Sequence, residues 1–260
     1  MSEHECSGCG KGCGPAPEPT PKLEPNALSK IKKVIGITGG KGGTGKSLVT
    51  GLLAAELSKK GKQVAVLDAD ILAPAVSQMF DLPQGVTRGE EGLYPALSER
   101  GVKLMSISLL LESETESVTW HSSVMAGILQ QLWSNVIWDQ VDYLLIDLPP
   151  GTGDVTITAF DRLPFDGLVV VSTPQAVVNR AVERTLLLAA EKQVPVFGFV
   201  ENFSGLFSGD ALDRLAVRYQ LPITDRLAFD PVLTDAADEG RLESLGSTYL
   251  PNTVALLEAL

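Results

Sequence analysis

Residues 40–47 fit the phosphate-binding pattern G-x-x-x-x-G-K-[ST] without a mismatch. Glycines let backbone N–H groups close around phosphate oxygens, because no Cβ blocks the approach. We expect Lys46 to reach the β- and γ-phosphates and the Ser47 hydroxyl to bind Mg²⁺. The candidate nucleotide-binding residues of this loop are Gly40, Lys41, Gly42, Gly43, Thr44, Gly45, Lys46 and Ser47.

Acidic side chains follow two of the apolar runs that predict strands. Asp68 and Asp70 come directly after residues 63–67, and Asp147 ends residues 143–147. Ligands of parallel sheets bind at the carboxyl ends of the strands, so we expect these acids beside the phosphate loop. We assign Asp147, through water, and Asp68 to the Mg²⁺ shell, and Asp70 to orienting the attacking water. Solvated loop acids are the alternative, above all at Asp68.

Strands and helices must alternate to position these groups. Apolar runs rich in β-branched residues predict strands at residues 34–38, 63–67, 102–107, 143–147, 167–172 and 195–200. Apolar spacing and length predict helices at residues 48–60, 122–135, 176–192, 210–219 and 248–260. Continuous apolar strands joined by helices indicate an α/β fold of three layers, a mostly parallel sheet covered by helices on both faces.

The chain has 260 residues, enough for one large domain. We expect a flexible Cys- and Pro-rich tail at residues 1–30 and an ATPase domain at residues 31–260. The net charge of −11 disfavours nucleic acid as a partner. No apolar run is long enough to span a membrane, and the acidic N-terminus does not fit a signal peptide. These features predict a cytoplasmic protein.

All three cysteines, Cys6, Cys9 and Cys13, lie within eight residues of the tail. Thiolates at this spacing can converge on an iron–sulfur cluster or a zinc ion, and the glycines between them allow tight turns. A fourth ligand could come from His4, a second chain or an outside thiol. A disulfide is disfavoured by the odd count in a cytoplasmic protein. A tail with incidental thiols remains the alternative.

The phosphate loop carries a second lysine, Lys41, which a standard phosphate loop does not need. The form Lys-Gly-Gly-x-Gly-Lys-Ser resembles the deviant loop of the MinD/ParA/nitrogenase-iron-protein class. The resemblance implies a homodimer in which Lys41 crosses the interface to the partner's nucleotide and stabilises the transferring phosphoryl group. Lys41, Lys46 and Asp70 are therefore the candidate catalytic residues.

A closer resemblance covers roughly residues 33 to 260. Its motifs lie at residues 41–47, 68–71, 142–154, 172–175 and 200–204, and together they look like the Mrp/ApbC group of ATP-dependent iron–sulfur cluster carriers. The resemblance implies that Asn202 contacts the adenine and that the Asp230-Pro231 turn lies near the base. Residues 149–153, Pro-Pro-Gly-Thr-Gly, look like a switch loop beside the γ-phosphate.

The chain departs from that group at the position of the group's Cys-x-x-Cys pair, which holds a [4Fe–4S] cluster between two chains. Here the stretch that follows Ser204 reads Gly-Leu-Phe-Ser-Gly-Asp and contains no cysteine. The group's Trp-Arg-Gly-Pro segment reads Trp-His-Ser-Ser at residues 120–123, and its Gly-Pro-Ser reads Ala-Pro-Ala at residues 73–75. The chain therefore keeps the nucleotide-binding motifs of the group but lacks the group's cysteine pair for the cluster.

Three functions remain open from the sequence. The first is a homodimeric MgATPase that hydrolyses ATP to ADP and phosphate and carries an iron–sulfur or related cluster to an apo-metalloprotein or scaffold. The second is a MinD/ParA-like switch that dimerises with ATP and recruits a partner without metal. The third is a chaperone dedicated to one metalloenzyme. The last 12 residues contain no Lys or Arg, which argues against anchoring to anionic lipid.

Overall fold

A computed structural model of the protein describes residues 20–110 and 122–260. Within these residues, eight strands form one sheet, parallel throughout except for the antiparallel pair β5 and β6. Across the sheet the strands are β10 (Ile223–Ala228), β9 (Val196–Ser204), β8 (Gly167–Ser172), β1 (Lys30–Gly39), β7 (Gln140–Asp147), β2 (Val64–Asp68), β6 (Lys103–Met105) and β5 (Ala96–Leu97). A separate ribbon pairs β3 (Thr87–Arg88) with β4 (Leu93–Tyr94).

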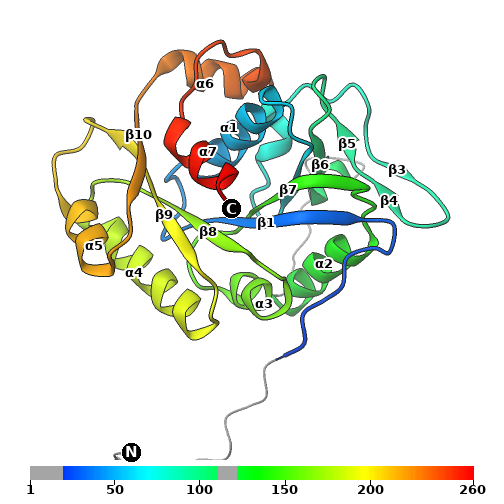
Figure 1. Ribbon diagram of the computed structural model, residues 1–260, viewed down its shortest axis with the longest axis horizontal. Helices are drawn as coiled ribbons and strands as arrows, with labels where there is room; N and C mark the ends of the chain where they lie inside the picture. The colour runs from blue at the N-terminus through cyan, green and yellow to red at the C-terminus, as the bar shows by residue number, and fades with distance from the viewer. Residues whose placement is uncertain (1–19, 111–121) are drawn as a thin grey trace, which may run out of the picture.

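Helices cover both faces of the sheet (Figure 1). One face carries α1 (Lys46–Lys59), α6 (Pro231–Asp238) and α7 (Pro251–Glu258). The other carries α2 (Ser122–Asn135), α3 (Asp154–Arg162), α4 (Ala176–Glu191) and α5 (Ala211–Tyr219). Short 3₁₀ segments lie at η1 (Val76–Met79), η2 (Ile107–Leu109) and η3 (Leu242–Ser244). The α/β fold of three layers expected from the sequence is confirmed.

The central strand β1 shows how the layers fix the nucleotide end of the sheet. Its side chains alternate between the faces, so Ile35 and Ile37 belong to the core beneath α1 and Val34 to the core beneath α2 and α3. All three side chains are buried. Because β1 is buried on both faces, its position is fixed by packing. The phosphate loop that follows its carboxyl end is therefore anchored at its first residue.

The expected strands and helices overlap observed ones, but three short strands (β3, β4 and β5), the strand β10 and the helices α3 and α6 were missed. The sequence of β10 carries Asp225 and Arg226 in its middle and does not form a continuous apolar run. In α3, four successive β-branched residues at positions 155–158 favour a strand locally, and packing against α2 overrides that preference. The strand expected at residues 102–107 is shorter, because η2 begins at Ile107.

Residues 22–29 run along the domain, although we assigned them to the tail. The Lys22 ammonium donates to the Phe160 carbonyl at 2.6 Å, and the Leu23 N–H donates to the Arg162 carbonyl at 2.7 Å. The indole N–H of Trp133, a buried residue of α2, donates to the Leu23 carbonyl at 3.1 Å. The domain boundary at residue 30 stays a prediction. Cys6, Cys9 and Cys13 lie outside the described residues.

In residues 20–110 and 122–260, no helix has both the length and the apolar character needed to cross a membrane.

Candidate nucleotide-binding site

The phosphate loop connects β1 to α1 at the carboxyl edge of the sheet. Gly43 and Gly45 have φ angles of 76° and 87°, in the left-handed region that glycine adopts without strain. At Gly40 the need for glycine is steric, because a Cβ would lie 2.4 Å from the backbone nitrogen of Val182 in α4. The sequence therefore gives this loop the backbone that a phosphate cradle requires.

The loop is joined to the end of β7 through Ser47. Its hydroxyl donates to Asp147 Oδ2 at 2.6 Å, and the Thr50 hydroxyl lies 2.9 Å from Asp147 Oδ1. Asp147 is completely buried, and Lys46 is only 6% exposed. The structure thus brings together the lysine, the hydroxyl and the carboxylate that sequence reasoning assigned to phosphate and Mg²⁺.

Burial sets the electrostatics of Asp147. Loss of water raises the pKa of Asp147 to about 6, although Lys46 and the hydroxyl groups of Ser47 and Thr50 oppose the shift. The carboxyl of Asp70 adds to the rise. A buried carboxylate with this pKa is stabilised by a nearby cation. Its oxygens and the Ser47 hydroxyl are hard donors of the kind that Mg²⁺ prefers.

Asp68 lies beside Asp147 on the neighbouring strand, and its carboxylate is turned toward the loop that follows β2. Oδ1 accepts the Asp70 N–H at 3.1 Å, and Oδ2 accepts the N–H groups of Ala75 and Val76 at 3.1 and 3.3 Å. Burial and the nearby Asp147 raise the pKa of Asp68 well above its ordinary value. Asp68 therefore ties down the loop that carries Asp70, and its place in the Mg²⁺ shell stays a prediction.

Asp70 is only 8% exposed and accepts the Ala73 N–H at 3.3 Å. Burial raises the pKa of Asp70, and the charge of Lys46 opposes that rise. A cavity of about 330 Å³ adjoins Asp70 and extends between the loops after β2 and β7 to Met125 of α2. Asp70 therefore faces open space at the correct edge of the sheet, and its role toward water stays a prediction.

Asn202, in β9, approaches the phosphate loop directly. Its side-chain amide donates to the Thr44 carbonyl at 3.1 Å, and the residue is buried. A Cβ at Gly45 would lie 2.1 Å from the same amide nitrogen, so glycine there makes room for Asn202. The loop and Asn202 are therefore in contact, and the contact of Asn202 with adenine stays a prediction.

Asp230 and Pro231 do not form an isolated turn but begin α6. The Asp230 carboxylate accepts the Val232 N–H at 3.0 Å as an N-cap and the Tyr249 hydroxyl at 3.1 Å, and Pro231 is the first helical residue. Both are favourable helix-start positions for these residue types. Their nearness to the base stays a prediction.

Lys41 and the switch candidate lie at the rim of the site. Lys41 is exposed, in contrast to the buried Lys46. The Gly151 N–H, in the loop at residues 149–153, donates to the Gly39 carbonyl at 2.9 Å. This bond links the loop after β7 to the start of the phosphate loop.

The loop at residues 205–209 follows β9 at the same edge of the sheet. It presents Leu206 and Phe207, which are 57% and 36% exposed. Among residues 20–110 and 122–260, no group of three or more His, Cys, Asp or Glu side chains could hold a metal ion. Mg²⁺ in nucleotide sites commonly takes one or two carboxylates together with substrate phosphates, and the Mg²⁺ role of Ser47 and Asp147 stays a prediction.

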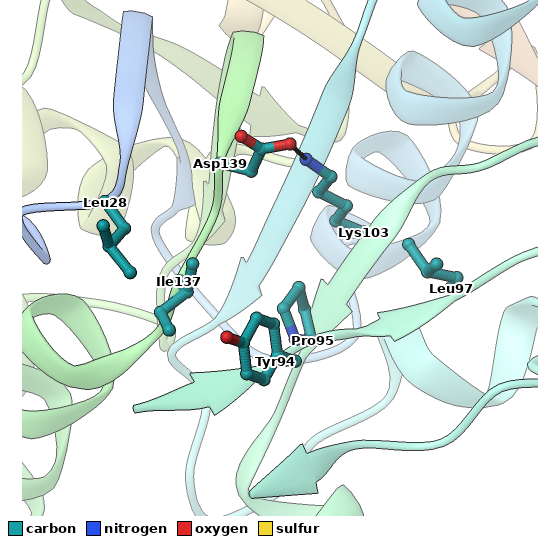
Figure 2. Close-up of a pocket in the computed structure, with 7 residues that line it drawn as sticks. All are labelled: Leu28, Tyr94, Pro95, Leu97, Lys103, Ile137 and Asp139. Carbon is teal, nitrogen blue, oxygen red and sulfur yellow. Dashed lines mark ion pairs between the residues drawn. The ribbon is translucent and has the colours of Figure 1, made fainter. Parts of the chain in front are cut away.

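A second pocket lies at the opposite edge of the sheet, where β1, β6 and β7 begin (Figure 2). It measures about 420 Å³ and is lined by Leu28, Tyr94, Pro95, Leu97, Lys103, Ile137 and Asp139. Lys103 and Asp139 form an ion pair at 3.7 Å there. Because the phosphate loop leaves the other end of β1, this pocket is not part of the nucleotide site.

Sequence reasoning missed one residue that contacts the site, Thr50. It lies one helical turn after Lys46 in α1, and it is fully buried. The available signal in the sequence was a hydroxyl side chain one helical turn after the phosphate-loop lysine. Its partner Asp147 is 97 residues away in the sequence, so the contact itself could not be foreseen.

The family described as NUBPL iron-transfer P-loop NTPase matches residues 30–248. An iron–sulfur cluster carrier protein of Clostridium perfringens is 37% identical over 260 aligned positions, which cover 93% of this chain and 91% of the relative. A nucleotide-binding protein from Archaeoglobus fulgidus, solved with ADP, is 37% identical with a TM-score of 0.73 over 84% of this chain and 90% of that one.

The cell-division ATPase MinD of Pyrococcus furiosus shares the fold, with a TM-score of 0.63 at 19% identity over 87% of this chain and 97% of that one. The family match spans most of the chain, and its residues include the loop, the strand ends and Asn202. The resemblance inferred from the sequence motifs is confirmed. The chain belongs to the NUBPL/Mrp-type family of iron-transfer P-loop NTPases.

Proposed function

We propose that the protein is a MgATPase that acts as a homodimer and carries an iron–sulfur cluster to an apo-protein or scaffold. The bond from Ser47 to Asp147 Oδ2 at 2.6 Å carries the nucleotide part of this proposal. It holds together the two oxygen donors that Mg²⁺ would need, beside the buried Lys46. Bound Mg²⁺ would neutralise charge on the phosphates, and Asp70 would orient the attacking water.

The cargo part of the proposal concerns the tail. Every cysteine of the chain lies at positions 6, 9 and 13, so only these residues can supply thiolates to a cluster. With three thiolates per chain, a fourth ligand from His4, a second chain or an outside thiol would complete the site. An incomplete ligand set favours transfer of the cluster over storage.

A metal-free switch is the second candidate. The exposed Leu206 and Phe207 favour it, because they stand in the loop where we expected the group's cysteine pair and offer contact surface to a partner. In that case ATP binding would drive dimerisation and partner recruitment, and the tail thiols would be incidental.

Lys46→Ala tests the nucleotide part. Removing the buried ammonium leaves the β- and γ-phosphates without their cation, so we expect no measurable binding of ATP or ADP by calorimetry and no hydrolysis. Lys32→Ala is the matched control, since Lys32 forms an exposed pair with Asp142 and lies near the other end of β1. Equal binding by the wild type and Lys46→Ala would contradict the assignment of the site.

A further inference from the structure

The Asp147 carboxylate is held on both sides by hydroxyl groups of α1. Ser47 donates to Oδ2 at 2.6 Å, and Thr50 lies 2.9 Å from Oδ1. Ser47 is three residues before Thr50 on the same helix, so both reach β7 from one face of α1. The carboxylate has no other hydrogen-bond donor within residues 20–110 and 122–260. Its orientation therefore depends on these two contacts.

The Thr50 hydroxyl has one proton and two acceptors within reach. Its oxygen lies 3.0 Å from the Lys46 carbonyl and 2.9 Å from Asp147 Oδ1. A threonine inside a helix usually donates to the carbonyl four residues earlier. Here the ionised carboxylate is the stronger acceptor, because a hydrogen bond to a charged group is roughly twice as strong as a neutral one. The proton therefore goes to Asp147.

We propose that Thr50 is a positioning residue for Mg²⁺–nucleotide binding. By holding Oδ1, it keeps Oδ2 beside Ser47, where the two oxygens face the phosphate side of the site. Thr50 is fully buried, so water cannot replace the bond if the hydroxyl is removed. The freed carboxylate would then rotate away from Ser47, and this change weakens its hold on Mg²⁺. This inference rests on the nucleotide part of the proposed function.

Three substitutions separate this role from simple packing. Thr50→Val keeps the shape of the side chain and removes the hydroxyl, whereas Thr50→Ser keeps the hydroxyl. Thr185→Val is the matched control, because Thr185 is also fully buried and its hydroxyl donates to the carbonyl four residues earlier in α4, that of Ala181, at 3.4 Å. Thr185 lies outside the nucleotide site, so removal of its hydroxyl measures only the effect of replacing a buried threonine by valine in a helix.

The measurement is the dissociation constant of a fluorescent ADP analogue, once with excess Mg²⁺ and once with EDTA. We expect Thr50→Val to reduce the Mg²⁺-dependent gain in affinity by about ten-fold or more while affinity in EDTA stays near that of the wild type. Thr50→Ser should restore the gain, and Thr185→Val should leave it unchanged. Thermal unfolding without nucleotide checks that each variant is folded.

An unchanged Mg²⁺-dependent gain in folded Thr50→Val would overturn the inference. If that variant does not fold, Thr50→Ala gives the same test, since it removes the hydroxyl without placing a second methyl group against the carboxylate. Equal losses in Mg²⁺ and in EDTA would also overturn it, because they would indicate a general packing defect. A wild-type protein that binds no ADP would instead contradict the proposed function, so the two failures are distinguishable.

Discussion

Two loops at the carboxyl edge of the same sheet differ sharply. The phosphate loop, residues 40–47, contains the buried Lys46 and is joined to the neighbouring strand end by the bond from Ser47 to Asp147. The loop at residues 205–209 exposes Leu206 and Phe207 and contains no cysteine and no charged side chain. One loop is built to hold charged groups at fixed positions, and the other presents apolar surface.

The difference separates two tasks within one chain. Phosphoryl chemistry needs cations and oxygens in fixed positions, so its residues are buried and tied by hydrogen bonds. A cargo that must be released needs accessible ligands, and we propose that Cys6, Cys9 and Cys13 supply them. If they do, the phosphate loop and the cysteines should respond to substitution independently.

After Lys46→Ala, the largest effect on hydrolysis is expected at Lys41, the one lysine of the phosphate loop that is exposed. If Lys41 acts in the partner's site, Lys41→Ala should lower the ATP hydrolysis rate by about a thousand-fold, as loss of an arginine finger does. Nucleotide binding by the monomer should stay near normal. The test is steady-state hydrolysis of the variant beside wild type.

A mixing experiment shows whether Lys41 acts across the interface. Lys41→Ala and Asp70→Asn chains, each inactive alone, should regain activity when mixed, because one of the two composite sites is then intact. Lys41→Ala protein that hydrolyses ATP at the wild-type rate would count against a lysine that acts across the interface.

Asp70 gives the next largest effect. Asp70→Asn keeps the shape of the side chain and removes the carboxylate that would orient water, so we expect hydrolysis to slow by about a hundred-fold with little change in ATP affinity. Asp81→Asn, at an exposed site, is the control. Single-turnover hydrolysis is the measurement, and a wild-type rate in Asp70→Asn would remove Asp70 from the mechanism.

Glu56 tests whether the far end of α1 is only structural. Its buried carboxylate accepts the N–H groups of Tyr249 and Leu250 at 2.6 and 3.2 Å. Burial raises the pKa of Glu56 above its ordinary value of 4.5, with those two bonds opposing the rise. The folded protein therefore binds the proton more tightly than the unfolded chain does, and the contribution of Glu56 to stability falls as pH rises through the raised pKa.

Denaturant unfolding of Glu56→Gln at pH 5 and pH 8 measures this effect. The stability of wild type relative to the variant should be greater at pH 5 than at pH 8, because the raised pKa lets the folded protein keep the proton to higher pH. Glu258→Gln is the control and should change little between these pH values, because Lys60 lowers the pKa of Glu258 and its contribution is lost only as pH falls below the ordinary range of a Glu carboxyl. Equal differences at both pH values for Glu56→Gln would show that its carboxyl does not titrate differently on folding.

The nucleotide end was largely predictable because its chemistry is local. The glycine pattern, Lys46 and Ser47 lie within eight residues, and Asp68 and Asp147 each end an apolar run that is a strand in the structure. The contacts that were not predicted depend on partners far away in the sequence. Thr50 acquires its role only when α1 packs on β7, and Asp225 of β10 finds its hydrogen-bond donors at Asn252 and Thr253 in α7.

Other features could not be predicted because packing outweighs local propensity. The β-branched residues 155–158 favour a strand locally, yet they lie in α3 against α2, and the sequence analysis predicted no element there. The prolines before residue 26 suggested an extended arm, and the hydrogen bonds of Lys22 and Leu23 to the end of α3 come from groups that composition does not distinguish. Backbone and ammonium contacts of this kind leave no pattern in the sequence.

The central claim is that iron–sulfur cluster binding and nucleotide binding reside in separate parts of the chain. Iron and acid-labile sulfide should be assayed after anaerobic reconstitution of wild type and of the triple variant Cys6→Ser, Cys9→Ser, Cys13→Ser, with ADP binding measured on both. We predict about one cluster per chain or per dimer in wild type, none in the variant, and equal ADP affinity. Equal iron and sulfide in the two proteins would contradict the claim.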